Sequence, residues 1–134
     1  MPDHLNYIAI LVAAASTFML GGLWYSPVLF GRAWMHEMGF TEEKLKALGG
    51  TGRIMGLSFV LELAMAILLA VFLGEKATLG SGLLSGAAAG FGWVALSLGV
   101  TYLFERKPLR LFLINAGYHG FAFTLMGGIL GAWR

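Results

Sequence analysis

Four polar side chains stand inside apolar stretches of this chain, where their chemistry needs an explanation: Glu62, Ser97, Asn115 and His119. Glu62 is the ninth residue of the stretch that begins at Ile54, and His119 is the ninth residue of the stretch that begins at Leu111. At the rise of an α-helix both side chains would lie at one depth, roughly 13 Å from the start of each helix. Asn115 is one turn shallower than His119, and Ser97 is at a comparable level. We therefore expect the four residues to form one polar cluster.

Ionisable groups at this depth suggest proton chemistry. A charged side chain at the centre of a bilayer costs about 2.5–3.5 kcal/mol on insertion scales, so it must be paired, neutralised or required for function. Glu62 and His119 could hydrogen-bond each other and lock the helices together. Glu62 could instead be protonated, because burial favours the neutral carboxyl. In the functional alternative Glu62 carries a proton in a binding site, with His119 as a tuning partner or second relay. The sequence leaves these alternatives open.

Other kinds of chemistry have little support. The chain has no Cys, which excludes disulfides and thiolate metal sites. His4 and His36 belong to opposite ends of the predicted helices, so neither can share a haem or metal site with His119. The sequence contains no Ser-His-Asp constellation, phosphate-binding loop or pair of catalytic carboxylates. We expect no catalytic residue, no bound metal and no cofactor.

The elements that must hold these residues are predicted to be membrane helices. The 134 residues are 58% hydrophobic and 12% charged, whereas soluble domains average about 25% charged residues. Four apolar segments of about 20 residues have the length that a bilayer requires, and none has the polar face of a soluble helix. They cover approximately residues 5–25, 54–74, 82–104 and 110–133. The prediction is an all-α integral membrane protein, one domain over 1–134, folded as an antiparallel bundle of four transmembrane helices.

The basic residues orient this bundle. Seven of the nine Lys and Arg lie in two connections, the loop 32–53 and the segment 105–110, while Lys76 and Arg134 lie at the other side. The positive-inside rule then places both connections in the cytoplasm and both termini outside. The expected partner is the lipid bilayer, and the small net charge of +2 gives no indication of nucleic-acid binding.

The first helix is predicted to end in the segment Trp24-Tyr25-Ser26-Pro27. Proline lacks an N–H and disfavours helix at the residue before it, so the chain should kink or stop there. The aromatic rings suit an exit through the membrane–water interface, and a binding role for the segment is the alternative. In loop 32–53, Thr41 is a candidate N-cap of a short cytoplasmic interfacial helix that ends at Gly49-Gly50.

Small residues mark the predicted helix contacts. Gly82, Gly86 and Gly90 recur every four residues, and Trp93, Ser97 and Thr101 would continue their stripe, so the whole face should be buried against protein. Gly21 belongs to a similar ridge on the first helix. On the last helix Gly120 and Gly128 lie roughly opposite Asn115 and His119. That helix is therefore either central in the bundle or shared with a second copy, and a homodimer is the expected assembly.

The sequence also resembles a known family, catalogued as domain of unknown function 1761. The resemblance rests on Asn6-Tyr7, on "GGLWYSPVLFGRAW" at 21–34 and on "ERKPLRLFLINAGYHGFAFTLMGGILGAW" at 105–133. It implies a small bacterial protein of the cytoplasmic (inner) membrane with four spans, and it implies no established activity or catalytic residue.

Three functions remain open. The first is a non-enzymatic membrane module or subunit of a larger membrane complex. The second is a small proton-coupled transporter or binding protein that uses Glu62. In outline this is similar to the small multidrug resistance family, but here the Glu is in the second helix and the charge bias is strong. The third is a membrane enzyme acting on a lipid or quinone, which has the least support because no nucleophile–base pair can be assigned.

Overall fold

The fold was obtained as a computed structural model that describes residues 5–133; His4 and Arg134, named above, lie outside them. Within this part every regular element is a helix and no strand occurs. The all-helical prediction is therefore confirmed. The elements are α1 (Tyr7–Trp24), α2 (Gly31–Met38), α3 (Glu42–Leu48), α4 (Thr51–Leu73), α5 (Leu79–Ala87), the π-helix η1 (Ala88–Val94), α6 (Ala95–Glu105) and α7 (Leu109–Ala132).

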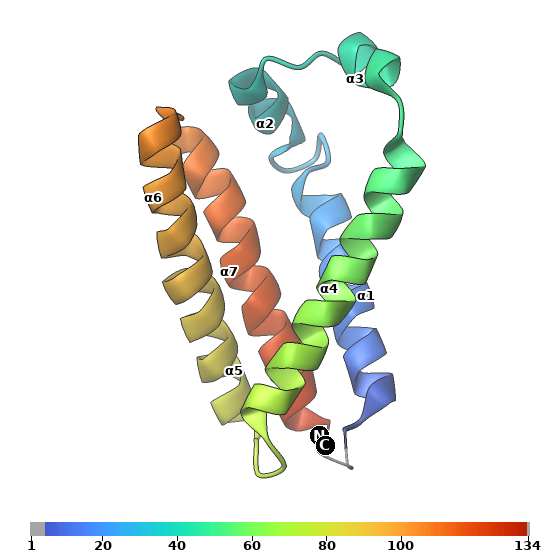
Figure 1. Cartoon of the computed structure of the whole chain (residues 1–134), viewed down its shortest axis with the longest axis vertical. Helices are drawn as coiled ribbons and strands as arrows, with labels where there is room; N and C mark the ends of the chain where they lie inside the picture. Colours follow the sequence, from blue (N-terminus) through green and yellow to red (C-terminus); the bar gives the residue numbers. More distant parts are fainter. Residues whose placement is uncertain (1–4, 134) are drawn as a thin grey trace.

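The other long helices pack around α7 (Figure 1). α5, η1 and α6 make one continuous rod that runs antiparallel beside α7, while α1 and α4 cross each other on its other side. α1 begins where α7 ends, and the Asn6 amide donates to the Trp133 carbonyl at 3.3 Å. α2 and α3 lie at the opposite end of the bundle. α7 therefore contacts every other long helix.

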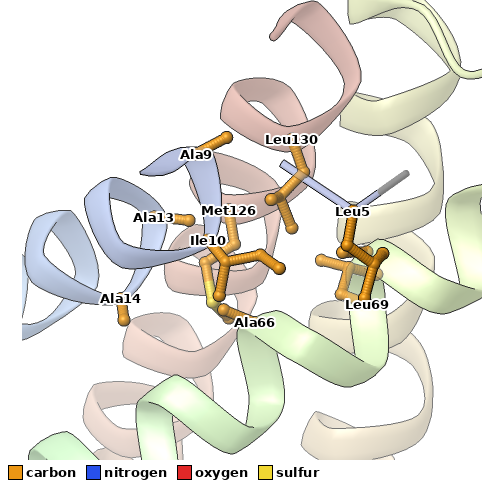
Figure 2. Packing of buried hydrophobic residues seen from close by; sticks show 10 residues of the cluster. Leu5, Ala9, Ile10, Ala13, Ala14, Ala66, Leu69, Met126 and Leu130 are labelled. Atoms are coloured by element: carbon orange, nitrogen blue, oxygen red, sulfur yellow. The ribbon is translucent and has the colours of Figure 1, made fainter. Parts of the chain in front are cut away.

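The apolar core lies where α1, α4 and α7 meet (Figure 2). Alanines dominate the side of α1 that enters it, with Ala9, Ala13 and Ala14 fully buried, and Met126 and Leu130 of α7 fill the space between them and α4. Small side chains let the helix backbones approach closely, and dispersion forces between helices grow with that closeness.

Glycine residues line the contact between α5 and α7. A Cβ atom added at Gly82 would lie 2.0 Å from the Gly127 carbonyl oxygen, and one added at Gly86 would lie 2.1 Å from the Phe123 carbonyl oxygen. Gly90 and Gly120 leave similar room, the latter for the ring of Phe91, and Gly128 makes room for Leu83. These glycines contact neighbouring helices as expected.

The rest of the predicted stripe does not face protein, and this corrects the sequence analysis. Trp93 is 71% exposed, and Ser97 and Thr101 are exposed as well. The cause is η1, whose wider turn adds a residue between Gly90 and the next buried position, Ala95. Each residue turns a helix by about 100°, so everything after η1 is rotated relative to a regular α-helix.

Three helices are long and apolar enough to cross a membrane by length and composition: Tyr7–Trp24, Thr51–Leu73 and the rod Leu79–Glu105. α7, the fourth expected span, has the length but is not among them. Asn115, Tyr118, His119 and its glycines lower its hydropathy. It is also the helix with the largest number of buried residues. Its central position brings both its glycine side and its polar side against other helices of the chain.

Two helix boundaries lie where the sequence predicts them. α1 ends at Trp24, just before Ser26-Pro27. α3 begins after Thr41, whose side chain accepts a hydrogen bond from the Lys44 N–H at 3.1 Å. α2 is an additional short helix that the sequence analysis does not predict.

Candidate functional site

The candidate site is centred on Glu62, the one carboxyl group that the described part of the chain buries. Its side chain projects from the middle of α4 and is 8% exposed. The Tyr118 hydroxyl of α7 lies 2.5 Å from Glu62 Oε1 and 3.0 Å from the Thr17 carbonyl oxygen of α1. Glu62 Oε2 is buried and has no hydrogen-bond partner in this part of the chain. Three helices thus meet at one hydroxyl group.

The sequence makes room for this meeting point on α1. Gly21 stands beside the Tyr118 ring, because a Cβ added there would lie 3.2 Å from the Tyr118 oxygen. The Thr17 side chain is buried too, but its hydroxyl donates to the Ala14 carbonyl at 2.9 Å. The Thr17 main-chain carbonyl, one turn before Gly21, is therefore what α1 offers to Tyr118.

A second polar cluster lies one turn nearer to α2 and joins α1, α6 and α7. Tyr25, directly after α1, donates its hydroxyl proton to Asn115 Oδ1 at 2.6 Å, and Asn115 Nδ2 donates to the Tyr102 hydroxyl at 2.7 Å. The Tyr25 and Tyr118 rings contact each other with centroids 5.6 Å apart. The two clusters therefore touch through these rings, and within the described residues no hydrogen bond joins one cluster to the other.

Trp24 fixes the end of α1 to α7. Its indole Nε1 donates to the Ile114 carbonyl at 2.9 Å, and its ring packs on Phe30, on Phe121 and against Gly117. The chain then turns sharply through Ser26 and Pro27. Gly31 is required at the end of this turn, because a Cβ there would lie 2.3 Å from the Tyr25 carbonyl oxygen. The aromatic residues of this segment are thus half-buried against α7, while Pro27 is exposed.

The four residues predicted to form one cluster lie in four different settings. Glu62 and Asn115 belong to the two clusters just described. His119 is half-buried and makes an edge contact with the Tyr118 ring at 5.2 Å. Of the alternatives left open by the sequence, a hydrogen bond between Glu62 and His119 does not form: Tyr118 donates to Glu62 instead, and its neighbour His119 points about 100° away from it around α7. Ser97 is exposed and donates to the Trp93 carbonyl within its own helix.

The functional residue that the sequence analysis missed is Tyr118. A signal was present, since Tyr118 follows Asn115 by three residues and so lies near it on the helix surface. The sequence analysis considers Tyr25 as an interfacial ring and does not consider Tyr102, so it does not predict their hydrogen bonds with Asn115. The hydroxyl of a tyrosine needs a partner when it is buried.

The chemical groups available at the site are a carboxyl and a hydroxyl. No group of three or more His, Cys, Asp or Glu that could hold a metal ion occurs between residues 5 and 133. What the site does offer is a buried carboxyl with one bonded and one free oxygen, next to a hydroxyl that can reverse its hydrogen bond. At the α2 end of the bundle, Arg110 and Glu37 form an ion pair at 3.5 Å.

These contacts unite the two segments on which the family resemblance rests. Gly21, Trp24 and Tyr25 come from the first segment, and their partners Ile114, Asn115, Gly117 and Tyr118 come from the last. Residues 8–131 match the family described as "Protein of unknown function (DUF1761)". The chain belongs to this family. Comparison with curated proteins and with solved structures gives no significant match. The family carries no assigned activity, so function has to be argued from the site.

Proposed function

We propose that this chain is a small four-span membrane protein, a non-enzymatic module in which the Glu62–Tyr118 pair takes up and releases a proton. The observation that carries the proton-binding role is the position of the Tyr118 hydroxyl between two acceptors, Glu62 Oε1 and the Thr17 carbonyl. The membrane setting is supported by separate observations.

Exposed apolar side chains support a bilayer around the bundle. On α4 alone, Leu57, Leu61, Leu68 and Phe72 are each more than half exposed. Similar residues line the outer faces of α1 and of the α5–α6 rod. A soluble monomer rarely exposes so continuous an apolar surface. α7 completes the set of four spans in this proposal, because its polar residues face other helices and not lipid.

The ends of the bundle differ in charge, which supports one orientation. α2, α3 and the turn between α6 and α7 lie at the same end (Figure 1). That end carries seven basic residues: Arg32, Lys44, Lys46, Arg53, Arg106, Lys107 and Arg110. We propose that it faces the cytoplasm of a bacterial inner membrane, with both chain termini outside.

Cysteine labelling tests this orientation against a clean background, because the chain has no Cys. We expect a membrane-impermeant maleimide to label Lys76→Cys in spheroplasts, whose cytoplasmic membrane is closed. The same reagent should label Lys46→Cys only after that membrane has been permeabilised. Both positions are exposed, so they form a matched pair. If Lys46→Cys alone is labelled in closed spheroplasts, the proposed orientation is wrong. If both variants are labelled there, the protein does not have a single orientation.

The Tyr118 hydroxyl has one proton and two acceptors within reach. When Glu62 is ionised, that proton goes to Oε1, since a hydrogen bond to a charged group is stronger. When Glu62 is protonated, its O–H can donate to the Tyr118 oxygen, and the Tyr118 proton turns to the Thr17 carbonyl. Each protonation state of Glu62 therefore has its own complete hydrogen-bond arrangement at this hydroxyl, which is what a reversible proton site needs.

Few other titratable groups can compete with Glu62. On α7 they are Tyr118 and His119, and Tyr25 lies just beyond the end of α1. Within α1 the one titratable side chain is Tyr7, exposed at the far end, and α5 contains none. The basic residues belong to the two ends of the bundle. Glu62 should therefore titrate as a separate group.

Infrared difference spectroscopy in lipid nanodiscs tests the proposed function. We expect a protonated-carboxyl band that disappears as the pH rises and that is missing in Glu62→Gln. In Tyr118→Phe the same band should move in frequency, because its hydrogen-bond partner is lost. Glu105→Gln, which removes an exposed carboxyl at the end of α6, is the matched control and should keep the band. If wild type and Glu62→Gln give the same carboxyl bands at every pH, Glu62 does not exchange a proton.

A further inference from the structure

Glu62 lies at a boundary inside the bundle, with polar groups toward one end and apolar groups toward the other. The two ends are the α2 end and the terminal end, where α1 begins and α7 ends (Figure 1). One helical turn from the site toward the terminal end, each of the three helices has a buried alanine: Ala13 on α1, Ala66 on α4 and Ala122 on α7. One turn toward the α2 end, α4 has Ser58 and α7 has Asn115. The site therefore has different surroundings on its two sides.

The apolar core fills the terminal side (Figure 2). All ten buried residues of that core are apolar, and so are the eleven residues of α4 from Leu63 to Leu73, a length of roughly 16 Å. The hydroxyl groups of Thr17 and Thr124 each donate to a carbonyl oxygen of their own helix. Apolar space inside a protein stays dry, and an ion that enters it loses its hydration without replacement. This core gives a proton no polar group to follow.

The α2 side contains the cluster of Tyr25, Asn115 and Tyr102. Its hydrogen bonds of 2.6 Å and 2.7 Å join two hydroxyl groups and an amide. All three side chains are half-buried, whereas Tyr118 is 8% exposed. The Tyr25 ring contacts the Tyr118 ring with centroids 5.6 Å apart. Exposure thus rises from the carboxyl toward the α2 end, along side chains whose polar atoms can hold water.

We propose that Glu62 exchanges its proton with the solution at the α2 end alone, along water held by the Tyr25–Asn115–Tyr102 cluster. The inference rests on the proposed function, because it names the side from which the Glu62–Tyr118 pair is loaded. A hydronium ion that reaches the cluster gives a proton to the Tyr118 oxygen while the Tyr118 proton moves to Glu62 Oε1, and a water molecule is left. Release follows the same steps in reverse. A site open to one side cannot carry protons across a membrane, so the pair responds to the pH of the α2 side.

The other ionisable groups leave Glu62 as the carboxyl that reports this exchange. His119 contacts the edge of the Tyr118 ring at 5.2 Å and follows Asn115 by four residues, so it belongs to the polar side. Arg53 and Arg110 stand in the first turns of α4 and α7, and Arg110 is paired with Glu37 at the α2 end. On α1 the titratable side chain is Tyr7, exposed at the terminal end, and α5 has none.

The test requires a membrane in which only one end of the protein faces the bath. Lys46→Cys in α3 provides a thiol at the α2 end, and Lys76→Cys in the turn after α4 provides one at the terminal end. Both positions are exposed, and the chain has no other Cys. Each variant is tethered through its thiol to a gold surface, and a lipid bilayer is then formed around it. The bath faces the terminal end of tethered Lys46→Cys and the α2 end of tethered Lys76→Cys.

Surface-enhanced infrared spectroscopy then follows the Glu62 carboxyl band after a step in bath pH, with Glu62→Gln in each tether as the baseline. With the Lys76→Cys tether the band should follow the step promptly. With the Lys46→Cys tether it should follow only after a proton ionophore is added. Prompt responses in both tethers, or in Lys46→Cys alone, would overturn exchange at the α2 end while leaving the proton site standing. If no band titrates even with the ionophore, the proposed function itself is wrong.

Tyr25→Phe tests the role of the cluster. It keeps the ring that contacts Tyr118 and removes the hydroxyl, so in the Lys76→Cys tether it should lose the prompt response and still reach the same final amplitude. Tyr7→Phe makes the same change at the other end of α1, where the side chain is 68% exposed, and should respond as promptly as its parent. Equal rates for folded Tyr25→Phe and Tyr7→Phe would overturn the route through the cluster.

Discussion

Gly82→Ala should be among the most destabilising additions of a single methyl group to the bundle. The new Cβ would lie 2.0 Å from the Gly127 carbonyl oxygen and 3.0 Å from the Gly131 Cα. Both are backbone atoms, so no side chain can rotate away and the helices must separate. Overpacking of this kind costs typically 1–3 kcal/mol, and the separation would also weaken the contacts at Gly86 and Gly90. In lipid such packing is a main source of helix association.

The same substitution elsewhere on the rod isolates this effect. Gly92 lies in η1 of the same rod, and a Cβ added there would meet nothing within 4 Å. Alanine favours helix over glycine by up to about 1 kcal/mol, so Gly92→Ala should be neutral or more stable than wild type. Thermal unfolding of both variants in one detergent measures the difference. Equal midpoints would show that the close approach of α5 and α7 contributes nothing to stability.

The sequence predicts the helices well because their signals are local. The apolar segments have lengths that match α1, α4, the α5–α6 rod and α7 within a few residues. The end of α1 follows from Pro27, and the start of α3 follows from Thr41 as an N-cap. The spacing of Gly82, Gly86 and Gly90 also predicts a close contact. Each of these inferences uses residues within a few turns of one another.

The rotation of a helix is harder to predict, because it depends on tertiary packing. η1 moves the next buried position after Gly90 from the expected Trp93 to Ala95. In a π-turn the hydrogen bonds join residues i and i+5 in place of i and i+4, and no particular residue type in the sequence marks this change. α2 was missed for a related reason, since a predicted interfacial exit was enough to explain its aromatic residues.

The candidate site shows the same difference. The sequence predicts how far along its helix a residue lies, but not towards which neighbouring helix its side chain points. Counting residues from the helix ends brings Glu62 to the level of residues 118 and 119, which is correct. Which of the two faces Glu62 depends on how α1, α4 and α7 are rotated, and Gly21 and the alanines of α1 set that rotation. Sequence spacing alone favoured His119, the ionisable residue, over its neighbour Tyr118.

Tyr118→Phe should be the most damaging change at the polar site that keeps the shape of the side chain. It leaves both Glu62 oxygens without a donor in the described bundle, and an unsatisfied buried group costs about 1–3 kcal/mol, more if it is charged. Glu62→Met removes the acceptor instead and keeps the approximate volume. When both partners are replaced by apolar groups of similar shape, the loss can be nearly neutral. The double variant should therefore be more stable than Tyr118→Phe alone, with a coupling of about 0.5–3 kcal/mol.

Thermal unfolding of wild type, the two single variants and the double variant gives this coupling directly. Tyr7→Phe is the matched control, because Tyr7 is 68% exposed and its loss of a hydroxyl should change little. If the effects of Tyr118→Phe and Glu62→Met simply add, the hydrogen bond between the two residues does not stabilise the fold. Strong coupling would show that the carboxyl depends on Tyr118 to remain buried. Such coupling would support the proposal that Glu62 and Tyr118 act together as a proton site.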